Sequence, residues 1–88
     1  TTTFTPEMIN VTDDYVGQGY GVVSDLEREA MRALARSEGI LLDPVYTARA
    51  FGGLLDMIRA GRFQAGEHVL FWHTGGISGI FGYGERCL

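Results

Sequence analysis

The stretch that decides the fold is Glu38-Gly-Ile-Leu-Leu-Asp-Pro-Val-Tyr-Thr-Ala-Arg-Ala50, an apolar run that stops at Asp-Pro and restarts with helical spacing. Its first part, Ile40-Leu41-Leu42, has no polar alternation, which is typical of a strand covered on both faces in a parallel sheet. Pro44 suits the first turn of a helix, because that position has no intrahelical N–H bond to lose. We therefore predict a strand over 40–42 that leads into a helix over 45–60. Gly52-Gly53 within that helix predicts a close approach by another part of the chain.

A second strand is predicted by His68-Val-Leu-Phe-Trp-His73, which is rich in aromatic and β-branched residues. Strand, helix and strand make a right-handed βαβ unit with parallel strands, so the predicted fold class is α/β. The glycine-rich segment 77–84 follows as a short, loosely formed helix. In open α/β sheets, ligands bind at the carboxyl ends of strands, which places the expected ligand site at the turn 43–47.

The N-terminal half is predicted to add a short strand over 8–11, a glycine loop and a helix. Gly17-Gln-Gly-Tyr-Gly21 is a flexible loop in which Tyr20 is the only large side chain. Ser24-Asp-Leu-Glu27 matches a capping box, so a helix is predicted to begin there and to end at Glu38-Gly39.

The composition excludes several classes of protein. The 88 residues suffice for one domain, whose thin core buries only about 60–65% of the unfolded surface. A net charge of −4 and eleven carboxylates spread along the chain argue against nucleic acid or an anionic membrane as a partner. Cys87 is the only cysteine and cannot form an internal disulfide, so we expect a reducing, cytoplasmic setting. All seven basic residues are arginines, and the chain contains no lysine.

Hydroxyl groups stand at the ends of both predicted strands. Tyr46 and Thr47 follow the first strand and Thr74-Gly75 follows the second, so we expect them to be neighbours in space. Together with Tyr20 they would form one polar patch. The alternative is that the hydroxyls cap helices and the tyrosine ring only packs, and spacing alone does not separate these interpretations.

Other polar groups are interpreted as structural. Thr74-Gly75-Gly76 before a helix could hold a phosphate, but the Gly-Lys-Ser/Thr ending of a P-loop is missing. His68 and His73 would point to opposite faces of a strand, so no metal site is expected. Asp13-Asp14 and Glu27-Arg28-Glu29 are interpreted as solvated surface.

Four motifs, in order and spacing, carry a resemblance to a known family. They are Val16-Gly-Gln-Gly-Tyr-Gly21, Ala35-Arg-Ser-Glu-Gly-Ile-Leu-Leu-Asp-Pro-Val-Tyr46, Gly61-Arg-Phe and Val69-Leu-Phe-Trp-His-Thr-Gly-Gly76. Together they resemble the C-terminal part of the pyridoxal-phosphate enzymes of the D-cysteine desulfhydrase and aminocyclopropane-carboxylate deaminase family. The resemblance implies part of the large domain of a fold type II enzyme, similar to tryptophan synthase β, with pyridoxal 5'-phosphate as cofactor.

The resemblance also implies roles for single residues. Tyr20 and Tyr46 look like the two active-site tyrosines, placed for proton transfer near the reactive carbon. Thr47 and Thr74 look like the polar residues near the pyridine ring, and Gly75 lies on the same cofactor side. In the deaminases we would expect glutamate at the position of Thr47 and leucine at that of Thr74, so two threonines favour the desulfhydrase side.

The implied reaction is β-elimination of D-cysteine to pyruvate, ammonia and hydrogen sulfide. Aminocyclopropane-carboxylate deaminase and L-cysteate sulfo-lyase are alternatives within the same family. An alternative of another class is a non-catalytic α/β binding or structural module that kept the motifs without the chemistry.

The absence of lysine limits each enzyme interpretation, because an enzyme of this kind holds its cofactor covalently through a lysine amine. We expect residues 1–88 to be a single fragment, the C-terminal part of the cofactor-binding domain, inactive alone. The expected partners are the remainder of the enzyme, a second copy in a homodimer, and a small amino-acid substrate. Ala48-Arg49 departs from the Gly-Lys expected in the family, which leaves the choice of substrate open.

Overall fold

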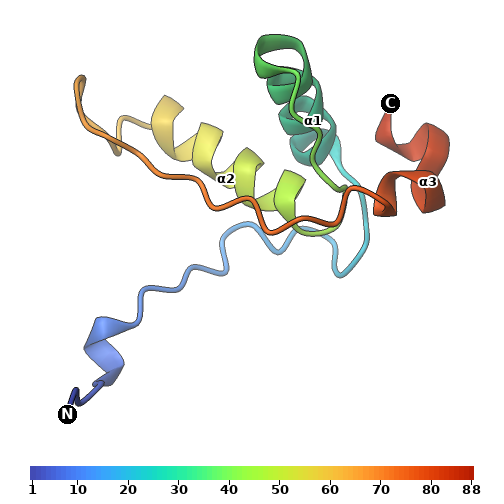
Figure 1. Cartoon of the computed structure of the whole chain (residues 1–88). Coiled ribbons are helices and arrows are strands. Elements are labelled where there is room, and N and C mark those ends of the chain that lie inside the picture. The colour runs from blue at the N-terminus through green and yellow to red at the C-terminus, as the bar shows by residue number, and fades with distance from the viewer.

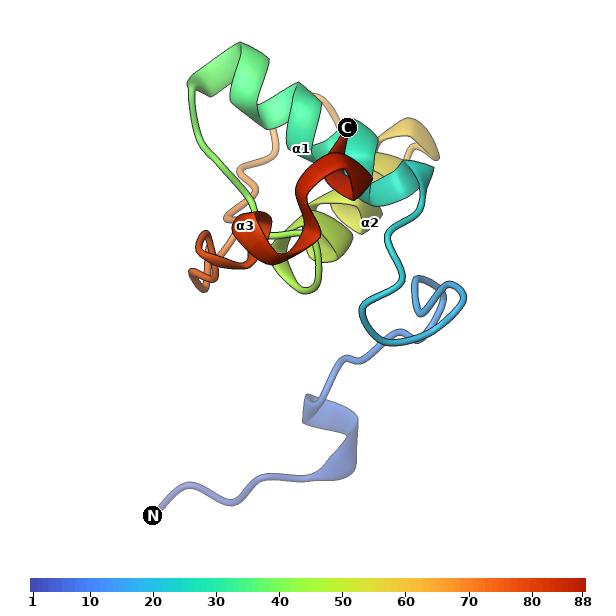
Figure 2. The same ribbon diagram turned by 90° about the vertical axis from the view of Figure 1, so that its right-hand side faces the viewer.

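The computed structural model describes all 88 residues as a short chain of helices joined by extended segments (Figure 1). The elements in order are η1 (Pro6–Met8), α1 (Asp25–Glu38), α2 (Thr47–Arg59), α3 (Gly79–Tyr83) and η2 (Gly84–Cys87). Helices α1 and α2 pack against each other and form the body of the molecule. Of the C-terminal pair α3 and η2, the latter lies beside α1, where Arg28 Nε donates to the Arg86 carbonyl oxygen at 2.9 Å (Figure 2). None of these helices combines the length and the apolar character needed to cross a bilayer.

Helix α1 forms where its end signals predict. The backbone N–H of Ser24 donates to Glu27 Oε2 at 2.7 Å, which is the reciprocal half of a capping box. At the other end, the Gly39 N–H donates to the Ala35 carbonyl at 3.0 Å. The predicted helix over this segment is confirmed.

The two glycines of α2 bring its backbone against neighbouring parts of the chain, as predicted. A Cβ at Gly52 would lie 2.7 Å from Leu26 Cγ of α1, and one at Gly53 would lie 3.1 Å from the ring of Tyr15. A side chain at Gly52 would force Leu26 to shift, and one at Gly53 would press on Tyr15, so glycine at both positions allows the close approach seen here. The predicted helix over 45–60 is observed as α2, which begins two residues later.

The predicted α/β fold is wrong, because the structure contains no strand and no sheet. The residues of both expected strands, 40–42 and 68–73, are extended, but no backbone hydrogen bond joins them. They meet instead through a side chain, His73 Nε2, which lies 2.8 Å from the Leu41 carbonyl oxygen. Aromatic and β-branched residues favour extended backbone, but a strand also requires a second backbone in register. The short strand expected over 8–11 is absent for the same reason, and the 3₁₀ turn η1 precedes it.

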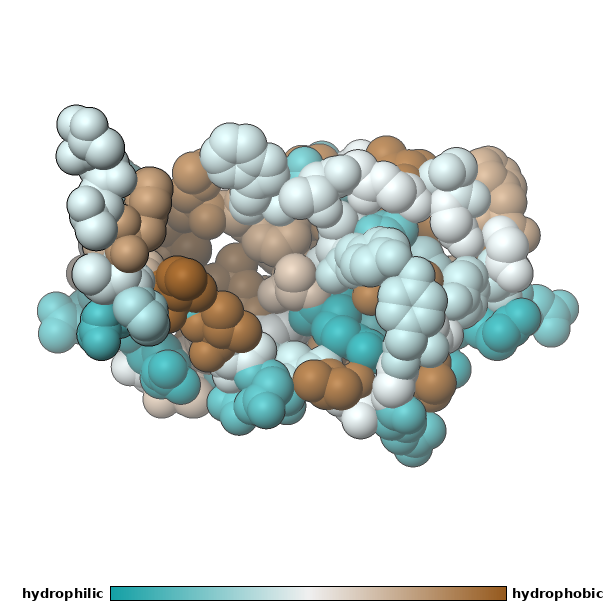
Figure 3. Space-filling model, turned by 90° about the horizontal axis from the view of Figure 1, so that it is seen from below, coloured by the Kyte–Doolittle hydropathy of each residue, from teal (hydrophilic) through white to brown (hydrophobic).

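The core is small, and much of the surface is uncovered. The buried apolar cluster consists of Ala30, Leu42 and Ala48, with Phe71 of the extended segment packed edge-on to Phe51 of α2. The chain exposes 6747 Å², whereas a compact monomer of 9.6 kDa exposes about 5,100 Å². Its radius of gyration is 14.6 Å, against about 12 Å for a compact chain of this length. Figure 3 shows apolar residues gathered on the face seen from below.

Candidate functional site

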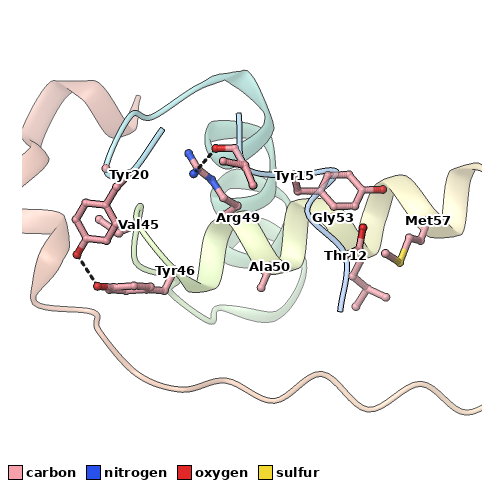
Figure 4. Close-up of a pocket in the computed structure, with 12 residues that line it drawn as sticks. Thr12, Tyr15, Tyr20, Val45, Tyr46, Arg49, Ala50, Gly53 and Met57 are labelled. Atoms are coloured by element: carbon pink, nitrogen blue, oxygen red, sulfur yellow. Dashed lines mark hydrogen bonds between the residues drawn. The ribbon is translucent and has the colours of Figure 1, made fainter. Parts of the chain in front are cut away.

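A groove of about 640 Å³ runs along one side of helix α2. Its inner wall is made by residues of α2 and the preceding turn that recur every three or four positions, and its outer wall by the segment 12–21 that crosses them. The lining residues are Thr12, Tyr15, Val16, Tyr20, Gly21, Val45, Tyr46, Arg49, Ala50, Gly53, Leu54 and Met57. Tyr20 and Tyr46 stand at one end, and Thr12 and Met57 stand at the other (Figure 4). Most of the lining residues are apolar, and the two phenols at the Tyr20 end are hydrogen-bonded to each other, whereas the Tyr15 hydroxyl at the other end donates to Asp56.

Two phenols meet at the Tyr20 end. The hydroxyls of Tyr20 and Tyr46 share a hydrogen bond of 2.5 Å, and the rings stand edge to face with centroids 5.9 Å apart. Both side chains face solvent, with Tyr20 78% and Tyr46 59% exposed. The hydrogen bond with Tyr46 is the main cause that raises the pKa of Tyr20, followed by the negative charge that an ionised Tyr46 would place beside it. Tyr20 therefore keeps its proton at neutral pH.

The turn that leads into α2 is organised by a buried carboxylate, Asp43. Its two oxygens accept hydrogen bonds from the backbone N–H groups of Val45, Tyr46 and Thr47 at 2.7–2.8 Å. Burial raises the pKa of Asp43, but the hydrogen bonds from Thr47 and from the backbone outweigh this effect, so that the pKa lies below its ordinary value. Asp43 is thus an ionised helix cap that fixes the backbone on which Tyr46 stands.

Thr47 is committed to the same cap. Its hydroxyl donates to Asp43 Oδ1 at 2.6 Å and accepts the Asp43 N–H at 2.8 Å, and the residue is buried. The capping alternative considered for the strand-end hydroxyls therefore describes Thr47. Its hydroxyl points into the turn, and the tyrosine pair lies in different surroundings.

The turn after the second extended segment lies against the first. A Cβ at Gly76 would lie 3.0 Å from Asp43 Cγ, so the two turns are in direct contact. The Gly75 N–H donates to His73 Nδ1 at 3.0 Å, and Thr74 is exposed. Thr74 and Gly75 are thus neighbours of the Asp43 turn, and the Thr74 hydroxyl is open to solvent.

An ion pair that the sequence did not reveal lies beneath the groove. Arg49 Nε donates to Glu27 Oε1 at 2.6 Å, and Glu27 is only 1% exposed. The interpretation of Glu27 as solvated surface is therefore wrong, because its side chain turns inward to cap α1 and meet Arg49. Burial raises the pKa of Glu27, but hydrogen bonds from Ser24 and Arg49 outweigh it and leave the pKa below its ordinary value. The only signal for this pair was an arginine on an otherwise apolar stripe of α2.

With this geometry in place, comparison with known protein families gives a clear result. A family model described as pyridoxal-phosphate dependent enzyme matches residues 2–75. The chain belongs to this family. The match includes both tyrosines, both threonines and Gly75, and the cofactor of the family is pyridoxal phosphate.

The residues present fit one side of such a cofactor. The chain offers exposed hydroxyls at Tyr20, Tyr46 and Thr74, which suit a polar ring and a substrate. It contains no lysine, so the covalent link to a pyridoxal-phosphate cofactor cannot come from these residues. No group of three histidine, cysteine or carboxylate side chains is placed to hold a metal ion.

Proposed function

We propose that this chain forms one wall of the active site of a pyridoxal-phosphate dependent lyase that acts on a small amino acid, most closely a D-cysteine desulfhydrase. The observation that carries the proposal is the pair of phenols, Tyr20 and Tyr46, joined at 2.5 Å at one end of the groove. Membership of the family supports the enzyme class and the cofactor. The two threonines, where a deaminase would have glutamate and leucine, support the choice of a β-elimination.

The proposed reaction converts D-cysteine and water to pyruvate, ammonia and hydrogen sulfide. The proton on Cα is removed, the bond between Cβ and sulfur breaks, and the electron pair leaves with sulfur as hydrosulfide, which is then protonated. When bound, pyridoxal phosphate withdraws electrons from the substrate's reactive carbon. The work of this chain is to hold a proton at the Tyr20 and Tyr46 hydroxyl oxygens, ready for the leaving sulfur.

The two threonines have different parts in this proposal. Thr47 already donates its proton to Asp43, so it has no donor to offer a ring nitrogen. Thr74 has an exposed hydroxyl on a turn that touches the Asp43 turn. We therefore assign the contact with the pyridine nitrogen to Thr74, with Gly75 beside it, and the support of Tyr46 to Thr47. A neutral hydroxyl at the ring nitrogen leaves a weaker electron sink than a carboxylate, which suits a good leaving group.

The remainder of the enzyme belongs to the proposal as well. A lysine for the cofactor has to come from outside these 88 residues, because none is present. The exposed surface is also large enough to bind a partner. The chain exposes about 1,650 Å² more than a compact monomer of its mass, and one partner in a standard interface buries roughly half of that area. We propose that the rest of the enzyme covers this surface, that the fragment alone is inactive, and that the enzyme forms a homodimer.

The test is turnover of the full-length enzyme with Tyr46 changed to phenylalanine. Loss of the hydroxyl should lower kcat for D-cysteine by about 100-fold, the usual size of one proton-transfer group, and leave the visible absorbance of the bound cofactor intact. Ser37→Ala is the control, because it removes a hydroxyl that donates to the Ala33 carbonyl near the C-terminal end of α1, outside the groove. Full activity of Tyr46→Phe would refute the proposal. Parallel assays with L-cysteate and aminocyclopropane-carboxylate would show whether the β-elimination assignment or one of its alternatives is correct.

A further inference from the structure

We propose that Arg49 is a positioning residue that fixes the tyrosine loop, residues 16–22, so that the phenol of Tyr20 meets that of Tyr46. The inference rests on the proposed function of the two tyrosines. It adds a residue whose guanidinium makes its hydrogen bonds to Glu27 and to the loop backbone, and which acts on Tyr20 through the loop.

One guanidinium makes four hydrogen bonds at this place. Nη1 donates to the carbonyl oxygens of Val16 at 2.7 Å and Gly19 at 3.1 Å, and Nη2 donates to that of Val22 at 2.8 Å. Nε donates to Glu27 at 2.6 Å. Three carbonyls spread over seven residues therefore converge on one cation, whose position is set from behind by a carboxylate.

Apart from Arg49, the loop has few restraints, one of which is the Tyr83 hydroxyl, 2.7 Å from where a Cβ at Gly21 would lie. Gly17, Gly19 and Gly21 have φ angles of 65°, 130° and 72°, values that side chains other than glycine rarely adopt. Because glycine has more backbone freedom than other residues, a loop with three glycines is flexible unless other groups restrain it. Its only internal backbone hydrogen bond joins the Val22 N–H to the Gly19 carbonyl at 3.3 Å. Since the Tyr20 ring is mostly exposed, packing does not hold it either. The bonds from Arg49 hold the backbone that carries this phenol, and its hydroxyl then meets that of Tyr46 (Figure 4).

The anchor behind Arg49 is itself rigid. Glu27 Oε2 accepts the Ser24 N–H at 2.7 Å and also bonds the Ser24 hydroxyl, while Oε1 is left for Arg49. Arginine suits this task because its planar guanidinium carries five N–H donors in a fixed arrangement. A lysine ammonium keeps the charge but offers three donors from one nitrogen, which cannot span Glu27 and carbonyls on both sides of the loop.

The experiment compares Arg49→Lys with Arg59→Lys in the full-length holoenzyme. Arg59 lies on the same helix, and its contact with Glu29, 3.6 Å long, is exposed on both sides. Arg49→Lys should lower kcat about 10-fold with KM changed less than about 2-fold, because a displaced proton donor affects the chemical step more than binding. Hydrogen exchange of a peptide covering 16–22 should be faster in Arg49→Lys and unchanged in Arg59→Lys.

A double variant separates positioning from a general structural role. If Arg49 acts through Tyr20, then adding Arg49→Lys to Tyr20→Phe should lower kcat less than about 2-fold further. The inference would be overturned if the kcat loss of the double variant equalled the product of the two single losses. It would also be overturned if Arg49→Lys left hydrogen exchange over residues 16–22 unchanged. If Tyr20→Phe alone keeps full activity, the proposed function fails, and the exchange measurement still decides whether Arg49 restrains the loop.

A second variant covers the case in which Arg49→Lys does not fold. Changing Glu27 and Arg49 to glutamine together removes both charges, so that neither remains unpaired in the interior. Cofactor absorbance at the wild-type level would show that the fold is retained. Faster exchange over 16–22 with a lowered kcat then supports the inference, and wild-type exchange contradicts it.

Discussion

Two regions of this molecule treat polar and apolar side chains in opposite ways. In the helical region, Glu27 and Asp43 are buried to 1–2% exposure, and every buried side-chain nitrogen and oxygen has a hydrogen-bond partner. In the extended region 63–76, Leu70 and Trp72 are 83% and 76% exposed. The helical region therefore supplies Asp43 and Arg49, which hold the turn of Tyr46 and the loop of Tyr20, whereas the extended region offers apolar surface that another part of the enzyme is proposed to cover.

The comparison also separates two kinds of stabilising contact. Buried carboxylates contribute only because their partners are in place, and removing one partner leaves a charge in the interior. Exposed apolar side chains contribute little until something covers them. Substitutions of buried polar side chains in the helical region should therefore change the free energy of unfolding, and substitutions of exposed apolar side chains in the extended region should change association.

The largest effect is expected at Glu27. Glu27→Ala leaves the guanidinium of Arg49 without its carboxylate and removes the capping box, which should lower the free energy of unfolding by about 3 kcal/mol. Glu29→Ala, two positions along α1, removes an exposed contact and should cost less than about 0.5 kcal/mol. Urea unfolding of both variants measures the difference. Equal costs would mean that burial of Glu27 does not distinguish it from a surface carboxylate.

A smaller effect is expected from acid, because protonation leaves the side chains in place. The pKa values of Glu27 and Asp43 lie below their ordinary values of 4.5 and 3.8, so the folded state binds these protons less readily than the unfolded state. Their contribution to stability is present above those values and is lost as the pH falls through the lower folded values. Urea midpoints should be constant from pH 7 to about 5 and then decrease toward pH 3. The decrease should be shallower in Glu27→Gln, and a midpoint independent of pH would contradict the assignment of Glu27 and Asp43 as ionised, hydrogen-bonded groups.

The helices could be read from the sequence because their signals are local. The capping box at Ser24, the end at Gly39 and the glycine pair at Gly52-Gly53 each act within a few residues or through a missing side chain, and all three predictions are confirmed. The strands were predicted wrongly, since residues 40–42 and 68–73 have the composition of strands but no backbone pairs with them. Local composition favours extended backbone, but a strand forms only when a neighbouring backbone pairs with it.

The site was predicted unevenly for a similar reason. Tyr20 and Tyr46 were chosen from a glycine loop and a turn, and the structure brings their hydroxyls together, while their catalytic roles stay a proposal. Thr47 was grouped with them, but its hydroxyl belongs to the Asp43 cap. The pair of Glu27 and Arg49 was missed because 22 positions separate the two residues, and no local pattern joins a capping glutamate to a distant arginine.

The smallest effect on stability is expected at Trp72, whose side chain is exposed although its neighbour Phe71 packs on α2. Trp72→Ser should change the free energy of unfolding by less than about 0.5 kcal/mol, because its side chain is already in solvent. Phe71→Ala, one position earlier, removes a ring that meets Phe51 edge to face with centroids 5.1 Å apart, and should cost about 2 kcal/mol or more. In sedimentation at increasing concentration, Trp72→Ser should associate less than the parent chain, since it removes exposed apolar surface. Unaltered association together with a large loss of stability in Trp72→Ser would mean that this region supports its own fold and does not await a covering surface.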